Sequence, residues 1–115
     1  MKATITHIGS QAIDPKEPML ILFDETATPA LREYSVVQHF AEPDEITLTP
    51  GMTLRFDDQA YQVAAVGRMA NQNLNELGHV TLIFGDEGAE NIANGVYLTP
   101  HVLPELHVES QIYYS

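Results

Sequence analysis

Short runs of β-prone residues, separated by turn-forming pairs, are the feature that most constrains how this chain of 115 residues folds. The runs are rich in Val, Ile, Thr, Tyr and Phe, which suit a pleated and half-buried surface. They comprise Ala3–Ile8, Met19–Phe23, Tyr34–Phe40, Thr53–Phe56, Tyr61–Val66, Val80–Phe84, Val96–Leu98 and Gln111–Tyr114. Many short strands at this spacing predict an all-β fold, in the form of a small closed or partly open β-barrel.

Two short helical pieces are expected between the strands. Thr28 before Pro29 has the pattern of an N-cap followed by proline at the first helical position. A second piece, Asn71–Leu77, puts Leu74 and Leu77 on one face, and Gly78 can end it in a left-handed conformation. Both pieces are too short to define the fold.

The length predicts one domain, residues 1–115, with a core that needs no metal or disulfide. The chain has no cysteine, which excludes a thiol nucleophile and suits the cytosol. Its first residues lack the apolar run of a signal peptide, and no stretch has the roughly 20 apolar residues of a spanning helix. We therefore expect a soluble cytoplasmic protein without direct membrane insertion.

The charge is strongly unbalanced, with 5 Lys and Arg against 16 Asp and Glu and a formal net charge of −11. Such a surface repels nucleic acid and anionic lipids. It favours a partner that presents a basic patch, although acidity can also serve only to keep a small protein in solution.

Familiar enzyme motifs are missing from the sequence. It contains no phosphate-binding glycine loop, HExxH, GxSxG or dinucleotide fingerprint, and it implies no cofactor. With so few basic residues there is little to clamp a nucleotide triphosphate, which argues against a self-contained kinase.

Histidine is the remaining candidate for chemistry, because a neutral imidazole nitrogen can accept a phosphoryl group near pH 7 and release it again. Any single histidine is more often a structural or surface residue than a catalytic one. The five histidines are His7, His39, His79, His101 and His107.

His39 lies within or at the end of a largely apolar strand. Tyr34, Ser35 and Gln38 lie close by in the sequence and could donate hydrogen bonds to phosphate oxygens. The alternative is a histidine half-buried at the edge of the core. His79 lies between Gly78 and a strand, where its ring could also bond a free helix carbonyl.

His101 and His107 flank the segment Val102–Leu106. A zinc site there would need further ligands such as Glu105 or Glu109, and the spacing does not demand one. We expect no metal site.

The stretch Tyr61–Phe84 resembles the sorbitol/glucitol-specific enzyme IIA components of the bacterial phosphotransferase system. Members carry V-x-A-V-G, then N-L-x-E-L-G-H-V-T-L, then F, which here are Val63–Gly67, Asn73–Leu82 and Phe84. The likeness covers nearly the whole chain. It extends back through Ile5–Gly9, Met19–Ile21, Glu33-Tyr34 and Pro50-Gly51.

The resemblance implies a phosphoryl relay. A histidine-phosphorylated phosphocarrier protein hands its phosphoryl group to a histidine of the IIA component. The group then passes to a cysteine of the IIB component and on to the hexitol that enters through the membrane component, IIC. The resemblance therefore implies these partners for this chain.

The family's acceptor histidine follows the Glu-Tyr pair. An ungapped match puts Gln38 at that position, and a one-residue insertion after Tyr34 brings His39 there. His79 matches its own motif without a gap and is the second candidate. We expect His39 on a strand, partly exposed in a shallow depression, with a hydrogen-bond donor near its ring and His79 close by.

Two other function classes remain open from the sequence. One is a non-catalytic acidic β-barrel that binds a partner or regulates transcription of a sugar operon. The other is a metal-dependent, cupin-like enzyme, which needs histidines and carboxylates that converge in space.

Overall fold

The computed structural model describes residues 2–14, 16–41, 45–85 and 93–115. Within these ranges the chain forms eight strands and two short helices. The strands are β1 (Lys2–Ile8), β2 (Met19–Phe23), β3 (Val36–Phe40), β4 (Thr53–Phe56), β5 (Gln59–Val66), β6 (Val80–Ile83), β7 (Gly95–Thr99) and β8 (Gln111–Tyr114). The helices are α1 (Pro29–Glu33) and α2 (Ala70–Leu77).

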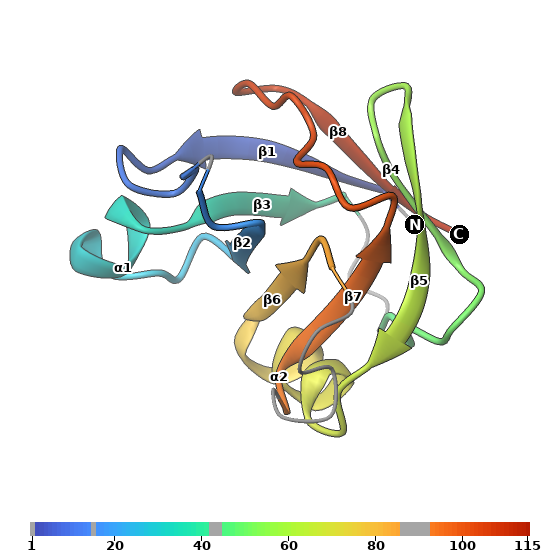
Figure 1. The fold of residues 1–115 in the computed structure, drawn as a ribbon. Coiled ribbons are helices and arrows are strands. Elements are labelled where there is room, and N and C mark those ends of the chain that lie inside the picture. The colour runs from blue at the N-terminus through green and yellow to red at the C-terminus, as the bar shows by residue number, and fades with distance from the viewer. Residues whose placement is uncertain (1, 15, 42–44, 86–92) are drawn as a thin grey trace.

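The strands form one closed barrel in the order β1-β3-β2-β6-β7-β5-β4-β8, which confirms the all-β barrel expected from the sequence (Figure 1). The ring closes where Lys2 of β1 pairs with Tyr113 of β8, so the two ends of the chain lie side by side. The β2–β3 and β6–β7 pairs are parallel, and the others are antiparallel. Closure leaves no free sheet edge among these strands.

The core fills the inside of the barrel. Alternate residues of each strand point inward, so that Leu20 and Leu22 of β2 face Leu82 and Val80 of the neighbouring β6 within one apolar cluster. Helix α2 adds Ala70 and Leu74 to this cluster at one end of the barrel.

The two helices start and end at the predicted signals. The Thr28 side chain accepts a hydrogen bond from the Leu31 N–H at the start of α1, and Gly78 ends α2 with a φ of 67°. Of Leu74 and Leu77, which the sequence puts on one face, only Leu74 is buried: Leu77 is 54% exposed, and the buried residues of α2 are Ala70 and Leu74. In the described part of the chain, no helix is long and apolar enough to cross a bilayer.

Candidate functional site

His39 lies on the outer face of β3, as the sequence predicts for a strand position. Its inward-facing neighbours Gln38 and Phe40 alternate with it along the strand, and the His39 side chain is 61% exposed. Its Nδ1 lies 2.7 Å from Oε1 of Glu25. The ring is therefore accessible to another protein and fixed on one side by a carboxylate.

Glu25 belongs to the loop between β2 and α1, and this loop is held by hydrogen bonds. The guanidinium of Arg32 donates from Nε to the Ala27 carbonyl and from Nη2 to the Glu25 carbonyl, both over 3.1 Å. The Asp24 carboxylate accepts from the Thr26 N–H over 2.9 Å and from the Thr26 hydroxyl. The loop thus presents Glu25 to His39 from a braced backbone.

The contact with Glu25 determines which tautomer of a neutral His39 ring is favoured. A carboxylate only accepts hydrogen bonds, so it favours the proton on Nδ1. The lone pair of that ring is then on Nε2, which is the nitrogen on the far side of the ring from Glu25. The arrangement suits an exposed imidazole that acts as a nucleophile through Nε2.

His79 lies directly after Gly78 and before β6. Its ring stacks on Phe23 of β2, with centroids 4.8 Å apart and an angle of 13° between the planes. Burial lowers the pKa of His79 below the ordinary value of 6.5, so this ring is neutral at pH 7. A Cβ at position 78 would clash with the Asp24 carboxylate, which shows how closely the β2–α1 loop packs against this turn.

The two candidate histidines share one outer face of the barrel. Phe23 and Val37 are partners in the β2–β3 register, and His39 is two residues beyond Val37 on the same side of β3. His79 stacks on Phe23 from the other side, so Phe23 and Val37 lie between the two imidazoles. His7 of β1 also pairs with Val37, which brings a third histidine to this face.

Two of the three donors expected near His39, Gln38 and Ser35, are not available to a phosphate. Gln38 is fully buried, and its Oε1 accepts from the Tyr114 hydroxyl over 2.6 Å inside the barrel. The Ser35 hydroxyl donates to the Leu31 carbonyl over 2.6 Å and is also buried. Tyr34 ends α1 instead of starting the strand. The expected donor is replaced by an acceptor, the Glu25 carboxylate.

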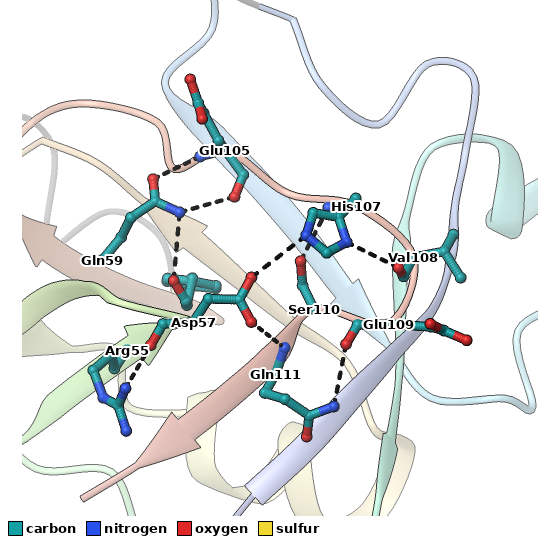
Figure 2. A network of polar contacts seen from close by, with 10 residues as sticks. Arg55, Asp57, Gln59, Glu105, His107, Val108, Glu109, Ser110 and Gln111 are labelled. Carbon is teal, nitrogen blue, oxygen red and sulfur yellow. Dashed lines mark hydrogen bonds and ion pairs between the residues drawn. The ribbon is translucent and has the colours of Figure 1, made fainter.

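His107 belongs to a different network, which ties the loop before β8 to the turn after β4 (Figure 2). Its Nδ1 lies 2.9 Å from the Val108 carbonyl, and its Nε2 is 3.8 Å from Oδ2 of Asp57. Asp57 Oδ1 accepts from the Gln111 N–H over 2.9 Å. This N–H bond holds the pKa of Asp57 below its ordinary value, with a smaller contribution from the Ser110 hydroxyl.

This network contains Ser, His and Asp but lacks the geometry of a catalytic triad. Ser110 is fully buried, and its hydroxyl oxygen accepts from the His107 backbone N–H over 3.1 Å. In a triad, the serine hydroxyl donates to the imidazole and remains open to substrate. Together with the Gln59 side chain, which bonds both backbone groups of Glu105, the network is a structural clasp.

Metal ligands do not converge in the part of the chain that the structure describes. No group of three or more His, Cys, Asp or Glu side chains in these ranges could hold a metal ion. His101 and His107 are both exposed in the segment between β7 and β8. The described residues therefore offer no ligand set for the cupin-like alternative.

The comparisons with known proteins agree on one family. The sequence model of the PTS system glucitol/sorbitol-specific IIA component matches residues 1–113. The glucitol/sorbitol-specific EIIA component of Escherichia coli K12 is 44% identical over 84 residues, which are 72% of this chain and 68% of that protein. The corresponding protein of Shigella flexneri is 43% identical over 84 residues with the same coverage. This chain belongs to the glucitol/sorbitol-specific IIA family.

A solved structure supports the same conclusion. The crystal structure of a PTS system IIA component from Enterococcus faecalis V583 matches with a TM-score of 0.93 and 47% sequence identity. The match covers 99% of this chain and 98% of that chain. The resemblance inferred from the sequence is thus confirmed, and the protein is a component of a sugar phosphotransferase system.

Sequence reasoning about this IIA component missed the residues around the candidate histidines. Glu25, Asp24 and Phe23 follow one another at the end of β2, and their roles depend on contacts with β3 and the turn before β6. The only local signal is an acidic pair that follows a strand. The partners become visible only when β2 is known to lie between β3 and β6.

Proposed function

We propose that this IIA component is the phosphoryl carrier of a sorbitol/glucitol uptake relay on the cytoplasmic side of the membrane. It accepts a phosphoryl group on a histidine from the histidine-phosphorylated phosphocarrier protein. It then passes the group to the IIB component, which phosphorylates the hexitol that enters through IIC. Membership of the glucitol/sorbitol-specific IIA family supports this role.

His39 is the acceptor in this proposal, and Nε2 is its reacting nitrogen. The observation that carries the assignment is the exposed ring on the barrel wall with Nδ1 at 2.7 Å from Glu25. A carrier has to present its imidazole to two proteins in turn, which requires exposure. It also gains from a fixed ring, because a fixed orientation lowers the cost of reaching the in-line geometry of transfer.

The transfer step exchanges one P–N bond for another. The lone pair of His39 Nε2 forms a bond to phosphorus as the bond from phosphorus to the donor histidine breaks, and the donor ring leaves with that electron pair. The proton on Nδ1 of His39 stays on that nitrogen, and the N–H donates a hydrogen bond to the Glu25 carboxylate. The carboxylate stabilises the positive charge that develops on the His39 ring during attack.

His79 is the second candidate for the acceptor. It is neutral at pH 7 and lies on the same face, but its ring is half-buried against Phe23. Burial limits the approach of a donor histidine, and we therefore rank it below His39.

The test is phosphorylation of purified variants by phosphoenolpyruvate, enzyme I and the phosphocarrier protein, followed by mass-spectrometric mapping. We expect His39→Ala to remove the acid-labile phosphate and His79→Ala to retain it. A third variant, His39→Ala with Gln38→His, tests the ungapped register. We expect it to stay unphosphorylated, because a side chain at position 38 points into the barrel.

Circular dichroism of each variant separates loss of the acceptor from loss of the fold. Phosphate on His79 in the His39→Ala protein would contradict the assignment of His39 and identify His79 as the acceptor. Phosphate on position 38 in the third variant would show that an inward ring is reachable. A wild-type protein that takes up no phosphate would support the binding-module alternative instead.

A further inference from the structure

A hollow lies on the outer side of β2, next to the histidine face. It has a volume of about 400 Å³ including its solvent-open mouth. Its apolar and aromatic lining residues are Ala12, Met19, Ile21 and Tyr34, and its polar and charged lining residues are Gln11, Asp14 and Glu17. We call this depression the β2 hollow.

The β2 hollow lies on the same face of β2 as Phe23, the residue on which His79 stacks. Met19, Ile21 and Phe23 alternate with the buried Leu20 and Leu22 and therefore point outward along β2. Residues two apart on a strand are separated by about 7 Å. A partner seated in the hollow thus lies next to Phe23, against which His79 stacks.

The charged residues that line the β2 hollow are both negative, and the exposed Lys16 between them in the sequence is not part of the lining. Asp14 and Glu17 are exposed at its rim. Throughout the described ranges, no Lys or Arg lies within ion-pair distance of a carboxylate, since both ion pairs found there involve histidine. The nearby Arg32 donates to backbone carbonyls of its own loop. The lining itself, with two carboxylates and no Lys or Arg, therefore disfavours an anionic ligand.

An apolar wall under a negative rim fits one kind of side chain well. Lysine and arginine have an aliphatic stem that packs on apolar surface and a cationic head that remains near polar or charged groups. Tyr34 adds an aromatic ring that can contact such a stem or a guanidinium. Tyr34 is 55% exposed, so this ring is open to a partner.

We infer that the β2 hollow docks a lysine or arginine side chain of the phosphocarrier protein. This inference rests on the proposed carrier function. The donor brings a phosphoryl dianion toward a face that already carries Asp24 and Glu25, and this approach is repulsive. A basic side chain of the donor is attracted to the carboxylates of Asp14 and Glu17. This attraction, which acts away from the reacting nitrogen, compensates for the repulsion.

The first test maps the interface directly. Amide chemical shifts of the ¹⁵N-labelled IIA component are followed while the unphosphorylated phosphocarrier protein of the same organism is added. We expect the largest changes at residues 11–12, 19–23 and 34. Changes centred instead on residues 57–59 and 105–111, where the clasp of Figure 2 lies, would overturn the inference.

The second test removes the charges at the rim. Asp14→Asn with Glu17→Gln should weaken the affinity for the phosphocarrier protein by roughly three- to tenfold and reduce its salt dependence, because exposed ion pairs are individually weak. Tyr34→Ala should weaken binding while the salt dependence is kept.

The matched control is Asp58→Asn with Glu105→Gln, which removes two exposed carboxylates beside the β4–β5 turn, far from α1 in Figure 1.

The outcomes separate docking from the carrier role. Equal affinity for the rim variant and the wild type, or equal weakening in the control, would refute docking in the hollow even if His39 is phosphorylated. If the IIB component perturbs the hollow and the phosphocarrier protein does not, the proposed occupant is wrong. Conversely, docking at residues 19–23 without phosphate on any histidine would support the docking inference and refute the proposed carrier function.

Discussion

At the scale of single residues, the barrel wall separates His39 from its neighbour Gln38. The His39 ring is 61% exposed, whereas Gln38 is fully buried and bonded to Tyr114. The Gln38 Nε2 has no hydrogen-bond partner among the described residues. Because successive side chains of a strand point to opposite faces, a shift of one residue decides whether an imidazole meets a partner protein or the core.

Glu25 provides a test of the chemistry at this scale. Glu25→Gln replaces the carboxylate by an amide that can either donate or accept, so the preference for the proton on Nδ1 is lost. We expect phosphorylation to become roughly two- to fivefold slower, because a contact between such exposed charged groups contributes up to about 1 kcal/mol. Rates are measured in single-turnover experiments with the phosphorylated phosphocarrier protein.

Nitrogen NMR of His39 in the unphosphorylated protein gives a readout independent of the rate. The wild type should show the proton mainly on Nδ1, and Glu25→Gln should show a mixture. Identical proton distributions in the two proteins would argue against an orienting role for Glu25.

The sequence alone could identify His39 and His79 as candidates but not the residues around them. His39 is recognisable from its strand context, and His79 from its place in the family motif. Glu25 is far from His39 in the sequence and reaches it only because β2 and β3 lie parallel. Strand alternation explains why Gln38, one of the expected donors, is unavailable, since it turns this side chain inward.

At the scale of elements, α2 is attached to the segment before β4 by two asparagines one helical turn apart. Asn75 accepts from the Ile46 N–H and donates to the Ile46 carbonyl, over 2.9 and 2.7 Å. Asn71 bonds both backbone groups of Leu48 in the same way, over 2.6 and 3.0 Å. The side-chain amides thus take the place of a neighbouring strand for this extended segment.

Removal of one of these amides should therefore cost stability. Asn71→Ala leaves the N–H and C=O of the buried Leu48 without partners, which costs about 1–3 kcal/mol of unfolding free energy. Urea denaturation measures this loss. Gln72→Ala, on the solvent side of the same helix, is the control and should change stability by less than about 0.5 kcal/mol. Equal stability of Asn71→Ala and the wild type would show that water satisfies the Leu48 backbone.

The clasp between the β4–β5 turn and β8 has a defined pH dependence. The Gln111 N–H keeps the pKa of Asp57 in the folded protein below 3.8. The clasp therefore stabilises the fold above pH 3.8, and this contribution is lost as the pH falls through the lowered pKa.

Asp57→Asn removes the charge but suits the backbone, because asparagine tolerates the φ of 55° at this position. At pH 7 the variant should be less stable by at most about 1 kcal/mol, since the Asp57 side chain is 36% exposed. Unfolding curves at pH 7, 5 and 3 should show the difference shrinking toward acid. A difference that grows toward pH 3 would contradict this assignment.

The elements themselves follow closely from the sequence. All eight strands lie where the β-prone runs predict, and α1 begins after Thr28 as expected. Turn residues and local preference determine these positions. The order of the strands around the barrel does not follow from the sequence in this way. For example, β1 pairs with β3 and β8 through contacts between residues far apart in the chain. Local patterns contain no information about such partners.

At the scale of the whole molecule, the dominant property is the net charge of −11. Charges of one sign on a small barrel steer a basic partner and are screened by salt, with a Debye length of about 10 Å at 0.1 M and 3 Å at 1 M. We expect the dissociation constant for the phosphocarrier protein to rise roughly tenfold between low and high salt. Isothermal titration calorimetry at several NaCl concentrations tests this, and a constant affinity would refute electrostatic steering.

Closure of the barrel through β8 also determines how this chain can fold. Ala3 pairs with Ile112, so the last contact of the ring joins segments that are more distant in sequence than those of any local hairpin. While a ribosome is still making the segment before β8, β1 and β4 each have one unpaired edge. The nascent chain must therefore avoid association through these edges until Gln111–Tyr114 emerges and fills the gap between them.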